Sequence, residues 1–408
     1  MFLFQVLSTD GSCREAVRQF LVWIAMENCT ASQNTSAYTK ARQRLRLPDL
    51  EEVNDSLIEQ LNDMRQPEDL WMGRDVKVFD GSSLSMPDTE ELQVLYPQPK
   101  SQKKGCGFST MRIMAAFSLA TGALITLTRS ALSIGENTLF RNMWDILNPG
   151  DVVLADRYFC NYTNFFYLEQ HYVDCVMRNH QRRTVGLDLI ETISKNDRII
   201  AWHKNSTCPK WLEKEEWIKL PNRLIVREIT ITVKRQGFRT KKIILATTLL
   251  DPILYPAADI AALYLQRWNA ELYLRDIKVS MGMNPLRCKS PGMVHKELQM
   301  YVIAYNLIRI IMFEAAQLDG ISWRILSFKG TIATIIHWTP IMLISSSAQA
   351  EQLYRLMLSY IARDKLPQRP GRREPRAIKR RQGRGYSLLT KPRTQFSELS
   401  HKSQYRKA

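Results

Sequence analysis

The stretch "DVVLADRYFCNYTNFFYLEQHYVDCVMR", residues 151–178, decides the fold class. Residues 151–156 form an apolar run of strand length that ends in an acidic residue, residues 164–172 favour a helix, and residues 173–178 indicate another strand. Working outward, "DVKVFD" (75–80) is a similar apolar run that also ends in Asp. A sheet that carries helices is the simplest arrangement for such alternation.

The segments on either side extend this pattern. Residues 108–120 and 123–132 are strand-like and flank a Thr-Gly pair that suits a tight hairpin turn. Residues 136–147 form a helical pattern, which "NPG" (148–150) stops. The order β-β-β-α-β-α-β therefore predicts an α/β fold with a mixed sheet flanked by helices.

Two further regions differ in texture from this sheet. Residues 14–65 are helical throughout, and their second piece carries Lys40, Arg42, Arg44 and Arg46. A basic second helix after a turn is compatible with a helix-turn-helix, and equally with a plain helical bundle that has a charged outer face. Short β segments between about 199 and 249 indicate an all-β insertion rich in Trp.

The expected domain organisation follows from these changes. We expect a helical N-terminal region that is a possible, shortened DNA-binding domain, a sheet domain in two parts around the β insertion, and a C-terminal helix with a basic tail. The boundaries are 1–72, 73–198, 199–250, 251–345 and 346–408.

The charge of the chain favours polyanionic partners. It holds 57 Lys and Arg against 40 Asp and Glu, a net charge of +17. Residues 365–408 contain 14 Lys and Arg against two Glu, so most of the excess lies in the tail. Nucleic acid is the first expected partner and an anionic membrane the second.

Cysteine usage and hydropathy favour a cytoplasmic protein. The seven Cys are scattered and never spaced as CxxC, which argues against a disulfide framework and a structural zinc site. The apolar start "MFLFQVL" lacks a basic n-region and is a poor signal peptide. The apolar run 300–316 contains Asn306 and Arg309, so we expect a buried helix there and no membrane partner.

Two carboxylates end apolar strands. Asp80 and Asp156 are each followed by turn-type residues, and they converge if the two strands are neighbours. Glu271, on a helix, could cross beside them. For either Asp alone, a turn or helix-cap role is the commoner explanation. Three carboxylates around one point repel one another unless a divalent cation such as Mg²⁺ neutralises them.

The third carboxylate belongs to a polar stripe. The segment "YLQRWNAELYLRDIK" (264–278) is predicted to be one helix, because it lacks Gly and Pro. At ideal helical spacing Tyr264, Arg267, Glu271 and Lys278 project at roughly 0°, 300°, 340° and 320°. The stripe is either a solvated ladder of ion pairs or one face of a working site.

These residues carry a resemblance to a known family. The spacing Y-x2-R-x3-E-x6-K, together with "VFDGSSLSMPDT" and "GDVVLADRYF", resembles bacterial insertion-sequence transposases of the DDE type, in the group named for that signature (YREK, family four of insertion sequences). The resemblance covers about residues 70–345. It implies a ribonuclease-H-like fold.

The resemblance also implies the site and its cofactor. Asp80, Asp156 and Glu271 would be the catalytic residues and would hold two Mg²⁺ ions, with Mn²⁺ able to substitute. Arg267 and Lys278 would contact phosphates of the transposon end, and Tyr264 would belong to the same face. Trp268, and one of Trp202, Trp211 and Trp217, are candidates for stacking on a flipped base, although core packing is the commoner role of any one Trp.

The implied function is DNA transposition by endonucleolytic cleavage and strand transfer. The partners would be double-stranded DNA, as inverted-repeat ends and as target, and a second copy of the chain in a homodimer on bacterial chromosomal DNA. Family members usually have more sequence before the first helix, so a shortened end-binding domain is expected. The alternatives are a metal-dependent nuclease of ribonuclease-H fold and a decayed element that only binds DNA.

Overall fold

The computed structural model describes residues 1–8, 10–26, 29–179, 187–233, 241–367 and 395. The sheet strands are β1 (Val76–Ser85), β2 (Thr110–Ser118), β3 (Leu124–Ala131), β4 (Val152–Ala155), β5 (Asp174–Arg178), β6 (Leu187–Ser194), β7 (Asp197–His203), β8 (Arg223–Val233) and β9 (Lys241–Thr247). The main helices are α1 (Phe2–Leu7), α2 (Cys13–Met26), α3 (Ser36–Arg44), α4 (Leu47–Met64), α5 (Glu90–Leu95), α6 (Glu136–Arg141), α7 (Tyr162–Gln170), α8 (Lys214–Lys219), α9 (Ala257–Leu265), α10 (Trp268–Arg275), α11 (Pro291–Leu318), α12 (Phe328–Leu343) and α13 (Ser347–Arg363).

One nine-stranded sheet runs through the molecule in the order β3-β2-β1-β4-β5-β9-β8-β7-β6. The first three strands are antiparallel neighbours, whereas β4 and β5 run parallel to β1. The predicted mixed α/β sheet flanked by helices is confirmed. The hairpin at Thr121–Gly122 is also where it was expected, and Gly122 has φ +69°, a conformation that Gly adopts without strain.

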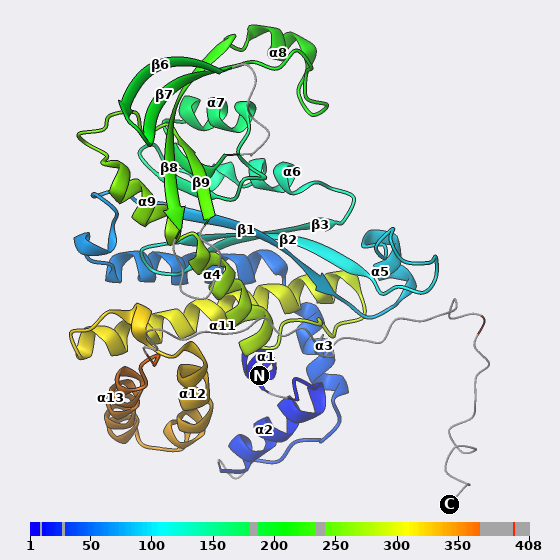
Figure 1. Ribbon diagram of the computed structural model, residues 1–408. Coiled ribbons are helices and arrows are strands. Elements are labelled where there is room, and N and C mark those ends of the chain that lie inside the picture. The colour runs from blue at the N-terminus through cyan, green and yellow to red at the C-terminus, as the bar shows by residue number, and fades with distance from the viewer. Residues whose placement is uncertain (9, 27–28, 180–186, 234–240, 368–394, 396–408) are drawn as a thin grey trace, which may run out of the picture.

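The sheet separates two apolar cores. On one face Val76, Val78 and Leu154 pack with α4, α10 and α11; on the other face Phe79 and Val153 pack with α6 and α7. Figure 1 shows α4 and α11 along one side of β1–β3, with α12 and α13 beyond α11. Alternation along β1 therefore decides which side chains reach α10, and Asp80 shares the face of Val76 and Val78.

The long helix α11 confirms the buried helix predicted from residues 300–316. Among the described helices it is the one long and apolar enough to cross a membrane, and 78% of that apolar window is buried inside the fold. Its Asn306 is fully buried, where it bonds Asn54 of α4 and the backbone of Leu124. Such burial satisfies the polar groups that had argued against a membrane span.

The insertion extends the sheet and is not purely β. Strands β6–β9 continue it by antiparallel pairing, but the short helix α8 lies between β7 and β8. Strand β6 begins at Leu187, twelve residues before the predicted start at 199. Helix α8 replaces a predicted β segment because the ring of its Trp217 is buried and packs near Tyr162 of α7, at 6.3 Å between ring centroids. The α8 segment therefore packs against a helix and does not join the sheet.

The three predicted N-terminal helices are present as α2, α3 and α4. Helix α4 packs along α11, and α1 also contacts α11. In α3 the side chain of Arg42 is buried, so the helix does not present all of its cations to solvent. The predicted basic tail lies almost wholly outside the described residues.

Candidate active site

The two strand-end aspartates lie on neighbouring parallel strands. The paired register of β1 and β4 runs Val76↔Val152, Lys77↔Val153 and Val78↔Leu154. Asp80 and Asp156 each lie two residues beyond the last pair, so the same register brings them side by side on the face of α10. The convergence predicted from sequence depended on this adjacency, which the sequence pattern alone did not establish.

The electrostatics of Asp80 connect it to both other carboxylates. Burial raises the pKa of Asp80 to about 6; the cation of Arg267 opposes the rise, while the charges of Glu271 and Asp156 add to it. Asp156 accepts a hydrogen bond from the backbone N–H of Arg157 at 2.7 Å. The charges of Glu271 and Asp156 therefore both reach Asp80, in a site that is partly shielded from water.

The helix that carries the polar stripe is not continuous, which corrects the prediction of a single helix over 264–278. Helix α9 ends at Leu265, α10 starts at Trp268, and residues Asp276–Ser280 form a π-helical turn. In this turn the N–H of Met281 donates to the carbonyl of Asp276 at 2.9 Å. The buried guanidinium of Arg309 contacts the Asp276 carboxylate at 3.4 Å, which favours the widened turn.

The stripe residues nevertheless meet beside the carboxylates. Arg267 donates to Glu271 Oε1 at 2.9 Å, and the Arg267 side chain is only 11% exposed. Burial raises the pKa of Tyr264 to about 12, with Arg267 opposing this and Asp156 adding to it. This pairing is partly the ion-pair ladder that was the alternative interpretation, but its cation is buried while the Glu271 side chain is 43% exposed.

Lys278 reaches the same strand as Asp80. Its Nζ donates to Ser82 Oγ at 2.7 Å and to the Ser83 carbonyl at 2.9 Å. Burial lowers the pKa of Lys278, and the Asp80 charge opposes this. The side chain therefore points along β1 toward the carboxylates, as a phosphate contact in this site requires.

The donor set suits a hard divalent cation. Asp80, Asp156 and Glu271 offer only carboxylate oxygens, which Mg²⁺ prefers. Within the described ranges, no three His, Cys, Asp or Glu side chains already converge closely enough to hold a metal ion. Glu271 is instead bound by Arg267. The residues fit the ion in chemistry, although Arg267 holds one of the two oxygens of Glu271.

The tryptophan candidates divide by exposure. Trp202 and Trp217 are buried in the core, which excludes them as stacking surfaces in this arrangement. Trp268 is 49% exposed beside Arg267, whose guanidinium carbon lies 5.2 Å from its ring. Trp211 is also exposed, but its ring is covered by Arg141 at 3.7 Å.

Sequence reasoning missed a second contact layer around Asp80. A Cβ at Gly81 would lie 3.1 Å from the carboxyl carbon of Glu136 and 3.3 Å from the Met114 methyl carbon. Asn137, next to Glu136, donates to the carbonyl of Tyr158 at 3.0 Å and so ties α6 to the loop after Asp156. The Gly after Asp80 was the available signal, because glycine beside a strand end often marks a close approach.

Comparison with known proteins identifies the family. The model of the transposase DDE domain matches residues 71–307. The chain belongs to the DDE transposase family. The matched residues contain β1, β4 and α10, and the predicted transposase is confirmed.

One curated relative and one solved structure are similar to this chain. This DDE transposase is 26% identical over 351 residues to transposase InsG of insertion sequence element IS4 from Escherichia coli strain K12, covering 85% of this chain and 76% of that relative. A solved synaptic complex of piggyBac transposase with hairpin DNA matches with a TM-score of 0.38 and 10% identity, over 72% of this chain. The chain spans 58% of that solved chain's length.

Proposed function

We propose that the chain binds transposon-end DNA and uses Asp80, Asp156 and Glu271 for Mg²⁺-dependent strand cleavage and strand transfer. The observation that carries this proposal is the register of β1 and β4, which brings Asp80 and Asp156 together beneath the helix that carries Glu271. These three residues would hold two Mg²⁺ ions. The ions supply activation of a water or hydroxyl nucleophile and stabilisation of the leaving oxygen.

The cations of the stripe have a separate task. Arg267 and Lys278 flank the carboxylates and would bind phosphate oxygens of the DNA backbone, while Tyr264 supports Arg267 from the buried side. A phosphate that attracts Arg267 would weaken its bond to Glu271, because both anions compete for one guanidinium. DNA binding would in this way release Glu271 toward Asp80 and Asp156. The exposed Trp268 ring is available to stack on an unpaired base.

The partners follow from the same chemistry. They are double-stranded DNA, as the inverted-repeat ends and as target, and a second copy of the chain in a homodimer assembled on DNA. The surplus of cations supports polyanion binding, and its concentration in residues 365–408 suggests that the tail also contacts phosphates. The expected location is the bacterial cytoplasm, on chromosomal DNA.

Cleavage of an end-bearing duplex tests the proposal. The substrate carries the inverted repeat that flanks the gene, with Mg²⁺ or Mn²⁺, and the variants are Asp80→Asn, Asp156→Asn and Glu271→Gln. Each should abolish cleavage while end binding, measured by gel shift, is retained. Asp319→Asn, at an exposed helix end, is the matched control. Near wild-type cleavage by any of the three variants contradicts the assignment. Binding without cleavage by the wild-type chain favours a decayed element.

A further inference from the structure

A second polar site lies where the N-terminal helices meet the start of α11. An open cavity of about 790 Å³ is lined by α1, α3, the first turn of α5 and the segment that leads into α11. Figure 1 shows α1 and α3 beside α11 on the side of the sheet away from α6 and α7. None of Asp80, Asp156 and Glu271 lines this cavity, and the function described so far makes no use of it.

Arg42 lines this cavity as a buried cation without a carboxylate partner. It is 7% exposed. Its Nη1 donates to the side-chain oxygen of Gln5 at 2.8 Å, and its Nη2 lies 4.0 Å from Cys288 Sγ. In the described part of the chain, Arg42 forms no ion pair with a carboxylate and its Nε has no hydrogen-bond partner. The guanidinium also lies over the rings of Phe2 and Tyr38, at 4.7 and 5.4 Å from their centroids. An anion that accepts a hydrogen bond from Nε would satisfy the one buried donor of Arg42 that lacks a partner among the described residues.

The start of α11 adds donors to the same cavity. This helix of 28 residues begins at Pro291, and its N-cap Ser290 makes no side-chain capping bond. Ser290 and Met293 both line the cavity. The first N–H groups of a long helix attract anions through their unpaired hydrogens and the helix dipole. The exposed Arg287 and Lys289 stand at the rim.

The carboxylates of the cavity do not neutralise Arg42 by direct pairing. Glu297 accepts hydrogen bonds from the backbone N–H groups of Arg287 and Cys288 at 2.8–3.1 Å, so its oxygens are already engaged. Glu90 and Glu91 are exposed in the first turn of α5, where that helix's own dipole stabilises them. An anion in the cavity would thus meet Arg42 and the rim cations, while Glu297 stays bound to the backbone beside them.

A continuous backbone path joins this cavity to the active site. Lys278 binds Ser82 and Ser83, and the following segment runs beside the end of β1: Asn284 accepts from the Ser85 N–H at 3.0 Å, and Leu286 donates to the Ser85 carbonyl at 3.0 Å. Arg287 is the next residue. From Asp80 to Ser85 a strand covers roughly 16 Å, which corresponds to about five base pairs of duplex.

We propose that this cavity binds a phosphate group of the DNA backbone, about five to eight base pairs inside the transposon end. The proposal rests on the proposed function for the identity of the DNA. Arg42 and the N-terminus of α11 hold the phosphate, and Arg287 and Lys289 draw the strand toward it. One duplex would then be gripped both at the catalytic carboxylates and by the N-terminal helices.

Single neutral phosphates locate the contact. End duplexes carrying one methylphosphonate at a time are titrated against the full-length chain without divalent metal, and affinity is read by fluorescence polarisation. We expect about a tenfold loss at a phosphate five to eight base pairs from the cleavage point. Arg42→Gln should show the same loss on unmodified DNA and no further loss at that position. A double variant with the exposed changes Arg287→Gln and Lys289→Gln should show the same loss of affinity as Arg42→Gln. It replaces Arg42→Gln in the test if that variant fails to fold. Arg355→Gln, an exposed cation on α13, is the control.

The outcomes separate the possible sources of phosphate. Additive losses from the variant and the methylphosphonate, or a scan without any sensitive position, overturn the proposal. Inorganic phosphate could raise the melting temperature of the wild type but not of Arg42→Gln, while no methylphosphonate position weakens DNA binding. That result would assign the cavity to free phosphate and would also overturn the proposal. Because the experiment measures binding, it tests the phosphate site even if the wild-type chain does not cleave DNA. A failure of cleavage would count against the proposed function alone.

Discussion

Asp80 and Asp156 occupy equivalent positions on adjacent parallel strands, each two residues beyond the paired Val78 and Leu154. Two carboxylates in such a position cannot relax apart, because the sheet fixes both backbones. The ionised Asp80 carboxylate destabilises the free protein, mainly because it is buried and to a smaller extent because Glu271 and Asp156 are near, and a bound cation would relieve this. Sites of this kind are commonly more stable when a functional charge is removed.

Removing the charge of Asp80 should therefore stabilise the protein at neutral pH. Its pKa is about 6 when folded against 3.8 for an ordinary Asp, so ionisation lowers stability as the pH rises through this window. The free energy of unfolding of Asp80→Asn should exceed that of the wild type by at most about 3 kcal/mol above pH 6. The two proteins should be equally stable below about pH 4, where the Asp80 side chain of the folded wild type is also neutral. Thermal unfolding over pH measures this, with Asp319→Asn as control. An equal gain at both pH values would show that the charge is not the cause.

A methyl group at Gly81 should impair cleavage more than it lowers stability. The added Cβ of Gly81→Ala would meet the carboxyl carbon of Glu136 at 3.1 Å and the Met114 methyl at 3.3 Å, so one neighbour must move. Both side chains are flexible, and we expect a stability loss of only about 1 kcal/mol. Cleavage should fall more, since displacement of β1 shifts Asp80. Gly135→Ala, where a Cβ has only the Tyr158 hydroxyl at 4.0 Å, is the control. Full cleavage by Gly81→Ala would show that this approach is unimportant.

How much the sequence predicted differs between strands and helices. The apolar runs ending in Asp80 and Asp156 predicted both strands, because buried strands have a strong local pattern. Their adjacency is a matter of topology that no local pattern contains. The π-helical turn at Asp276 contacts Arg309, 33 residues further along the chain, so ideal helical spacing could not predict it.

The N-terminal helices show the opposite case. The four cations of the second helix suggested a solvated or DNA-facing surface, yet Arg42 is buried against Gln5 and Cys288. Charge periodicity cannot distinguish a cation that faces solvent from one that faces a neighbouring helix of the same chain. That distinction needs tertiary contacts, and it is the origin of the cavity site proposed above.

Arg267 should be irreplaceable by Lys. The guanidinium of Arg267 is buried, binds Glu271 and lies over the Trp268 ring. A planar guanidinium can stay over this ring while two of its N–H groups bind a phosphate, which a Lys ammonium cannot do. The free energy of unfolding of Arg267→Lys should stay within about 1 kcal/mol of the wild type, but its cleavage rate should fall at least about tenfold. Arg355→Lys provides a matched control, because Arg355 forms an exposed i,i+4 pair with Glu351. Such pairs contribute only a few tenths of a kcal/mol. Equal cleavage by the two Lys variants would favour the plain ion-pair interpretation of the stripe.

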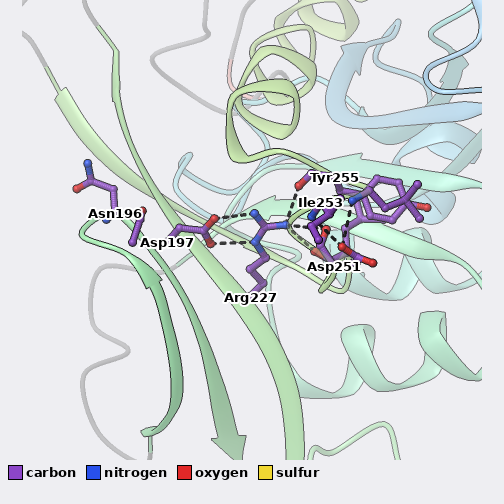
Figure 2. A network of polar contacts seen from close by, with 9 residues as sticks. Asn196, Asp197, Arg227, Asp251, Ile253 and Tyr255 are labelled. Carbon is purple, nitrogen blue, oxygen red and sulfur yellow. Dashed lines mark hydrogen bonds and ion pairs between the residues drawn. The ribbon is translucent and has the colours of Figure 1, made fainter.

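Arg227 joins the insertion to the segment that leads into α9. Its guanidinium binds both carboxylate oxygens of Asp197, at 2.8 and 2.6 Å, and donates to the carbonyls of Leu249, Asp251 and Tyr255 (Figure 2). The side chain is fully buried. This contact connects strands β7 and β8 to the residues that immediately precede the helix ending near Tyr264.

Removing one partner of this buried pair should be far worse than removing both. Arg227→Ala leaves the Asp197 carboxylate buried and unpaired and should destabilise the protein by about 3–5 kcal/mol. Adding Asp197→Asn should recover part of that loss, because the orphaned charge is gone, although three backbone carbonyls remain without their donor. Urea unfolding of the two single variants and the double variant measures the coupling. Arg223→Ala, whose pair with Asp188 is exposed, should change stability by less than about 1 kcal/mol. Additive losses would mean that the ion pair contributes no coupling energy, and that Arg227 stabilises the protein mainly through its contacts with the three carbonyls.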